Sequence, residues 1–200
     1  MAAQGGGQPA NGNPAGASAA VTPPVYTLDL AQAKIPPGQV NGTISGTNFL
    51  ADNVRIDPIG SAEVLRFIQG QGLSPDRQIL VYLHLKAGEK LGGQSLNIAA
   101  DGHGPQVAKS WKTNPRYAPL VKQFSTGYVM KLELGALTNE TVAGKIYLAL
   151  PDPEQTVVAG AFTANLSPMA ANAQMTPGAT PARPLTPADR SMYDRYGIRK

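Results

Sequence analysis

Hydrophobic and polar residues alternate between Lys145 and Leu166, and this pattern predicts two β-strands joined by a short turn. Ile146, Leu148 and Leu150 alternate with residues that are mostly smaller or more polar. The turn sequence PDPEQ follows, and apolar residues then resume at even spacing from position 158 to position 166. A period of two interrupted by a Pro/Asp turn is typical of a hairpin with one face on a core and the other near water.

Shorter segments with the same period predict further strands throughout the middle of the chain. They span residues 25–30, 40–46, 54–56, 63–68, 78–86, 95–99, 106–109 and 127–134. The clearest inward-facing sets are Ile79, Val81, Leu83 and Leu85 in one strand, and Tyr128, Met130, Leu132 and Leu134 in another. Eight to ten short strands without a long 3.6-residue period predict an all-β fold, an antiparallel β-sandwich of jelly-roll or immunoglobulin-like type.

The two ends of the chain differ in composition from the middle. Residues 1–24 are a Gly/Ala/Pro/Asn linker without charged side chains, and residues 167–186 form a Pro/Ala/Thr linker. Such segments bury too little apolar surface to offset the entropy of ordering, so we expect both to be disordered. The β-sandwich domain is therefore expected to span residues 25–166, followed by a short basic tail at 187–200.

A short helix is predicted in this tail. Thr186 can cap it, the following proline suits the first helical position, and Gly197 can end it. At about ten residues it would be marginal alone, so we expect its apolar side to dock on the domain or on a partner. The residues expected to bind a partner are Met192, Tyr193, Tyr196 and Arg195.

Charge and cysteine content narrow the possible partners. The formal net charge is +4, but residues 25–166 hold 12 Lys/Arg against 11 Asp/Glu, so most of the excess lies in the tail. Nucleic-acid binding by a nearly neutral domain is therefore not expected. Cysteine is absent, which removes disulfides and thiolate chemistry. No apolar run is long enough for a transmembrane helix, and the sequence predicts neither a cofactor nor a metal site.

One region combines cations with aromatic rings. Residues 102–132 contain no acidic side chain and include Lys109, Trp111, Lys112, Arg116 and Tyr117. Aromatic rings can stack on a sugar while Lys and Arg pair with its anionic groups, so these five residues are the predicted ligand-binding site. The alternative is that Trp111 plugs one end of the sandwich and the charges are solvated.

No spacing of catalytic residues identifies an enzyme. There is no Gly-x-Ser-x-Gly elbow or phosphate loop, and nothing marks a carboxylate pair for sugar hydrolysis. The phrase GKIYLALPD at residues 144–152 resembles, in a general way, accessory β-modules of bacterial envelope proteins. We expect a non-catalytic module that binds a glycan or a protein surface, with a polysaccharide or another envelope protein as partner.

Two alternative functions stay open from the sequence. The chain could be a structural subunit that docks through its C-terminal helix, or, third, a carbohydrate-active hydrolase. An extracellular or periplasmic location is expected, because residues 2–24 have the composition of a spacer that follows a leader. A cytoplasmic location stays open, and the sequence does not predict an oligomeric state.

Overall fold

The computed structural model describes residues 22–71 and 74–167, and this part of the chain is all-β. Its eleven strands are β1 (Asn41–Ile44), β2 (Thr47–Leu50), β3 (Asn53–Ile59), β4 (Ala62–Gln69), β5 (Arg77–Leu83), β6 (Ser95–Ile98), β7 (Gln106–Trp111), β8 (Leu120–Phe124), β9 (Val129–Thr138), β10 (Thr141–Ala149) and β11 (Val157–Leu166). The described residues include no helix, and therefore none that could cross a membrane.

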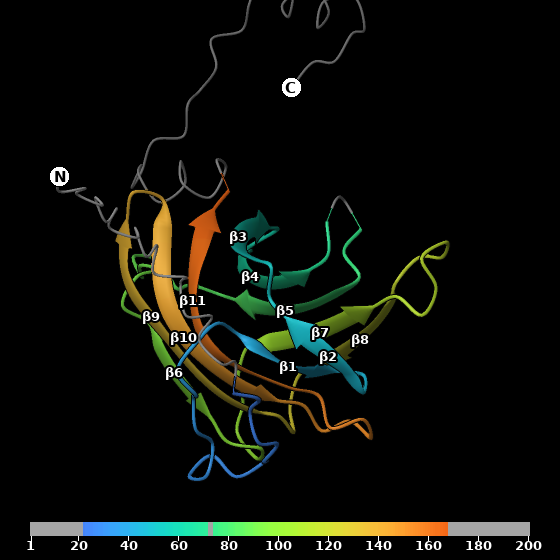
Figure 1. Ribbon diagram of the computed structural model, residues 1–200. Coiled ribbons are helices and arrows are strands. Elements are labelled where there is room, and N and C mark those ends of the chain that lie inside the picture. Colours follow the sequence, from blue (N-terminus) through green and yellow to red (C-terminus); the bar gives the residue numbers. More distant parts are fainter. Residues whose placement is uncertain (1–21, 72–73, 168–200) are drawn as a thin grey trace, which may run out of the picture.

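All eleven strands belong to one hydrogen-bonded sheet. Its main path runs β6-β9-β10-β11-β3-β4-β5-β7-β8, while β1 pairs with β11 and with β2. The sheet curves so that the wall formed by β9, β10 and β11 lies opposite β4, β5 and β7 (Figure 1). The predicted hairpin is confirmed as β10 and β11, which pair from Thr141↔Asn165 to Ala149↔Val157.

The core fills the space between these two halves. The predicted inward-facing residues within β5 and β9 are confirmed as members of one buried cluster, including Val81 and Leu132, which are almost completely buried. Leu85, predicted with them, lies beyond the end of β5 and is only partly buried against this cluster. Phe67 of β4 and Phe162 of β11 meet edge to face with ring centroids 5.1 Å apart. Alternation along the strands thus places one face of each half against the other.

The expectation of a purely antiparallel sheet is wrong. The C-terminal end of β11 pairs in parallel with β3 through Asn165↔Arg55 and Leu166↔Ile56, so the sheet is mixed. This pairing arises because β11 is longer than β1 and continues past it to reach β3. The predicted strand list also lacks β2 and β8.

The predicted strand at residues 25–30 is also wrong. Residues 25–37, here called the strap, form no strand but cross the outer face of β9, β10 and β11. The Tyr147 hydroxyl accepts a hydrogen bond from the Thr27 amide at 2.9 Å and lies 2.9 Å from the Val25 carbonyl, to which it can donate. Side-chain bonds thus replace the backbone ladder that the alternating pattern suggested.

The segment that follows the strap passes very close to β11. Gln39 bridges to Ala161, and the backbone of Gly160 faces the same crossing with φ +144°. A Cβ atom at Gly160 would lie 2.7 Å from the Gln39 oxygen and from the Val40 nitrogen. Only glycine permits this approach, which brings β1 alongside β11.

Candidate functional site

The predicted ligand-binding residues lie on one hairpin. β7 ends at Trp111, the chain turns through residues 112–119, and β8 returns antiparallel with Trp111 opposite Leu120 and Lys109 opposite Lys122. β8 pairs only with β7 among the described strands. The loop is the yellow-green segment that projects away from the rest of the molecule in Figure 1. The structure therefore brings the five residues onto one element, but it gives them different environments.

Lys109 points into the protein and is completely buried. Its Nζ atom lies 2.5 Å from Oδ2 of Asp152 and 3.2 Å from Oε2 of Glu154, both in the loop between β10 and β11. Burial by itself would raise the pKa of Asp152, but the hydrogen bonds from Lys109 and Thr156 outweigh it and hold that pKa below its ordinary value. Lys109 is therefore withdrawn from the surface.

Trp111 and Lys112 lie at the base of the hairpin. The Trp111 ring is half-buried against the core and lies 4.7 Å from the Lys109 ammonium, a cation–π contact. Lys112 donates from Nζ to the Ser74 carbonyl, and its Nζ lies 3.7 Å from Oδ1 of Asp76. These two residues attach the hairpin to the body of the domain.

Large apolar side chains are exposed in the turn of the hairpin and at the start of β8. Tyr117 is 70% exposed, Leu120 is 50% exposed and Val121 is 60% exposed. Sequence reasoning singled out Tyr117 and the exposed Arg116 but missed the two aliphatic residues. The sequence does show these two aliphatic residues next to each other, between a proline and a lysine. The segment is too short for their spacing to predict whether they are buried or exposed.

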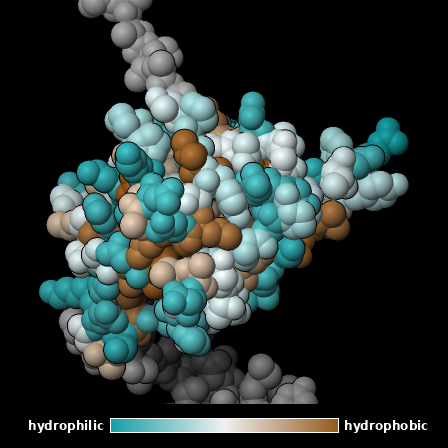
Figure 2. Space-filling view, turned by 90° about the horizontal axis from the view of Figure 1, so that it is seen from below, coloured by the Kyte–Doolittle hydropathy of each residue, from teal (hydrophilic) through white to brown (hydrophobic). Residues whose placement is uncertain are grey.

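These exposed residues occupy both faces of the hairpin. Leu120 lies opposite Trp111 and Val121 lies opposite Ser110, and consecutive residues of a strand point to opposite sides. In the space-filling view, the hairpin is the projection on the right, with a mainly hydrophilic tip and brown side chains near its base (Figure 2). A flat partner could cover only one of these faces, whereas a cleft could cover both.

The hairpin is also positively charged. Among the described residues, neither Arg116 nor Lys122 has a carboxylate partner, and both side chains are exposed. The Lys122 ammonium lies 5.3 Å from the centroid of the Phe124 ring. Because residues 102–132 contain no acid, nothing within this segment offsets the two charges, so the surface suits an acidic partner.

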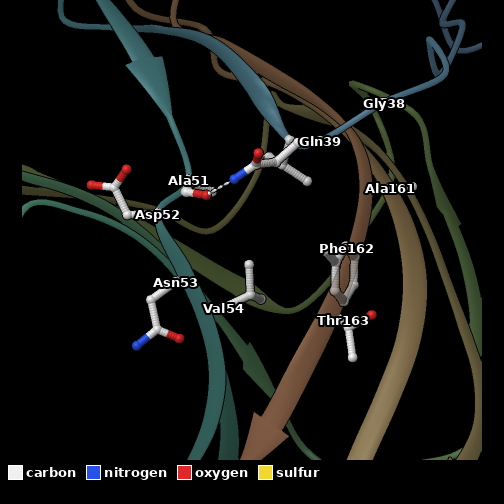
Figure 3. Close-up of a pocket in the computed structure, with 10 residues that line it drawn as sticks. Gly38, Gln39, Ala51, Asp52, Asn53, Val54, Ala161, Phe162 and Thr163 are labelled. Carbon is white, nitrogen blue, oxygen red and sulfur yellow. Dashed lines mark hydrogen bonds between the residues drawn. The ribbon is translucent and has the colours of Figure 1, made fainter. Parts of the chain in front are cut away.

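A cavity of about 400 Å³ lies elsewhere, where β1 and β3 separate along β11. Val54 and Phe162 line it, whereas the side chains of Asp52 and Asn53 point away from the space between them (Figure 3). The Gln39 amide donates to the Ala51 carbonyl, and the Asp52 carboxylate accepts from the Gly70 amide. The Gln39 and Asp52 side chains thus already have partners, and the residues that line the cavity include no reactive set of side chains.

The predicted partner-binding residues of the tail, Met192, Tyr193, Tyr196 and Arg195, lie outside the described residues, as does the predicted helix that carries them. Comparison of the chain with protein-family models, with curated proteins and with solved structures found no match.

Proposed function

We propose that this protein is a non-catalytic β-sandwich module that binds an acidic protein surface through the β7–β8 hairpin. The observation that carries the proposal is the exposure of Tyr117 in the projecting turn and of Leu120 and Val121 on opposite faces of β8 beside it. Large apolar side chains that gather on a projection, beside unpaired cations, are typical of an interaction site. Whether the sandwich is of jelly-roll or immunoglobulin-like type stays a prediction.

A protein partner is favoured over a glycan by the kind of side chains on the hairpin. Sugar rings stack on flat aromatic faces, but Trp111 is half-buried, and Tyr117 is the one largely exposed ring of the hairpin. Leu120 and Val121 offer aliphatic surface, which suits a protein cleft with apolar walls. Arg116 and Lys122 would meet acidic side chains at the rim of that cleft.

An exported or envelope-associated location is part of the proposal. It rests on the spacer-like composition of the N-terminal linker and not on the hairpin. A hairpin that projects from a compact domain would be accessible to a neighbouring envelope protein in such a setting.

The proposal is tested by the size of the complex in extracts of cells that produce the full chain. The double variant Leu120→Ser/Val121→Ser removes aliphatic surface from both faces of the hairpin. The matched control is Ile59→Ser, which changes another exposed aliphatic residue, 46% exposed, at the end of β3. We expect the wild-type chain and the control to migrate with a partner in native electrophoresis, and the double variant to migrate alone.

Two results would argue against the proposal. One is a wild-type chain that migrates at its own mass, and the other is a double variant that keeps the partner. The glycan alternative can be tested by tryptophan fluorescence, because Trp111 is the only tryptophan and lies on the hairpin, opposite Leu120. A saturable change in its fluorescence on titration with neutral or acidic polysaccharides would favour a glycan instead.

A further inference from the structure

The buried cluster around Lys109 holds the three groups that amide formation between side chains requires. Lys109 of β7 and Asp152 of the β10–β11 loop are 43 residues apart in sequence, yet Nζ and Oδ2 are 2.5 Å apart. Both side chains are at most 1% exposed. Glu154 reaches the same amine with Oε2 at 3.2 Å, while its own side chain remains 45% exposed. A lysine amine, a carboxyl carbon and a second carboxylate thus meet in one place.

We propose that Lys109 and Asp152 become joined by an intramolecular isopeptide bond, with Glu154 as the group that transfers protons. This goes beyond the proposed binding function and does not depend on it. Burial opposes the charge of Asp152, but hydrogen bonds from Lys109 and Thr156 keep its carboxylate ionised at rest. The reaction therefore starts from the ion pair and passes through a minor form in which amine and acid are neutral. Proton transfer from Nζ to Oδ2, along the hydrogen bond already present, produces that neutral pair.

The contacts of Asp152 suit attack on its carboxyl group. Oδ1 accepts a hydrogen bond from the Thr156 amide at 2.7 Å, whereas Oδ2 faces Lys109. When the Nζ lone pair attacks Cγ, the new C–N bond places negative charge on Oδ1, where the Thr156 amide stabilises it. The loop fixes this geometry, since the Gln155 amide also bonds to the Asp152 carbonyl at 3.0 Å.

Glu154 completes the proton balance. Its carboxylate accepts the second proton from Nζ and delivers it to Oδ2. The Cγ–Oδ2 bond then breaks and water leaves, so that an ammonium and a carboxylate are converted to a neutral amide and one water molecule. No oxidant or external reactant is needed. The partial exposure of Glu154 gives the departing water a route to solvent, and holding the reacting groups together supplies the entropic advantage.

The bond would fasten the base of the β7–β8 hairpin to the β10–β11 loop. Trp111 covers one side of the Lys109 ammonium at 4.7 Å and shields the cluster. A covalent link here would close a long loop of the chain, and such closure restricts the unfolded state as a disulfide does in a protein that contains cysteine. This chain has no cysteine.

The test is the intact mass of the purified full chain under denaturing conditions. We expect the wild-type protein to be lighter than its sequence by about 18 Da, the mass of the water lost when the amide forms. The variants Lys109→Arg and Asp152→Ala should have the full mass of their sequences, and Glu154→Gln should show slow or absent loss. Protease digestion of the wild type should give a branched peptide that joins residues 109 and 152.

A cyclic imide would produce the same mass change, and the design separates the two. Imide formation uses the backbone N–H of the next residue, and Asp152 is followed by Pro153, which has none. Asp101 precedes a glycine and could form an imide. The Lys109→Arg variant would still form that imide, but it could not form the isopeptide bond. A wild-type chain at its full sequence mass would overturn the proposal, and so would a loss that persists in Lys109→Arg.

Discussion

Removal of one hydroxyl group from Tyr147 tests how the strap is held. The phenol oxygen accepts from the Thr27 amide at 2.9 Å and can donate to the Val25 carbonyl at 2.9 Å or the Thr27 carbonyl at 3.0 Å. Burial raises the pKa of Tyr147, so the hydroxyl stays protonated and able to donate at neutral pH. Tyr147→Phe keeps the buried ring and removes these hydrogen bonds.

The expected loss follows from the number of bonds and their exposure. At any moment the hydroxyl makes two bonds, one accepted and one donated, each worth about 1 kcal/mol net. Water can reach the strap side of both bonds and replace part of the loss, because the backbone partners are only partly buried. We therefore expect Tyr147→Phe to lower the free energy of unfolding by about 1–2 kcal/mol.

Urea unfolding measures this change, and amide hydrogen exchange locates it. The Thr27 amide and its neighbours in the strap should exchange faster in Tyr147→Phe, while β4 and β5 stay protected. The matched control is Tyr82→Phe on β5, since no hydrogen bond of the Tyr82 hydroxyl is found among the described residues. Equal stabilities for the two variants, or unchanged exchange in the strap, would refute this account of the strap.

Three further predictions concern a close approach, a buried phenol and the hairpin. Gly160→Ala should lower the free energy of unfolding, measured by urea titration, by more than about 3 kcal/mol, because the new Cβ would collide with backbone atoms. The control Gly46→Ala has open space around the new Cβ and should cost about 1 kcal/mol. Burial raises the pKa of Tyr128 from 10.0 to about 12. The protonated phenol therefore stabilises the fold below pH 10, and this stabilisation is lost as the pH rises from 10 to 12. Urea unfolding measured across this pH range should show the loss in the wild type and not in Tyr128→Phe. Leu120→Ser/Val121→Ser should change the unfolding free energy by less than about 0.5 kcal/mol, since both side chains are exposed, and a larger loss would mean that the hairpin is held by packing instead.

The sequence predicted those strands in which one face meets the core. From Ile79 to Leu83 in β5 and from Met130 to Leu134 in β9, every second residue is apolar and buried, so a local pattern was sufficient. The sequence did not predict β8, because four of its five residues are exposed and the strand therefore lacks an alternating apolar face. The strap shows the opposite error: Tyr26 and Leu30 do pack on the outer face, but alternation cannot reveal whether the backbone pairs with a strand or with a side chain.

Composition located the hairpin, but it did not show which of its residues are buried and which are exposed. The absence of acids between residues 102 and 132 drew attention to the segment from Lys109 to Tyr117. The burial of Lys109 depends on Asp152 and Glu154, in a loop that the sequence indicated only as a turn. The parallel pairing of β3 with β11 likewise joins segments from opposite ends of the domain. Contacts between residues so far apart in sequence depend on the whole fold, and the local alternation of apolar and polar residues does not predict them.

The central claim is that the β7–β8 hairpin enters an acidic cleft of a partner protein. The most direct measurement replaces Tyr117 with a photoreactive amino acid in the full chain, irradiates cells that produce it, and identifies the adduct by mass spectrometry. Position 59, also exposed but at the end of β3, is the control. The account predicts one discrete protein adduct from position 117, attached next to acidic residues and absent from position 59. No protein adduct from position 117, or the same adduct from both positions, would contradict it.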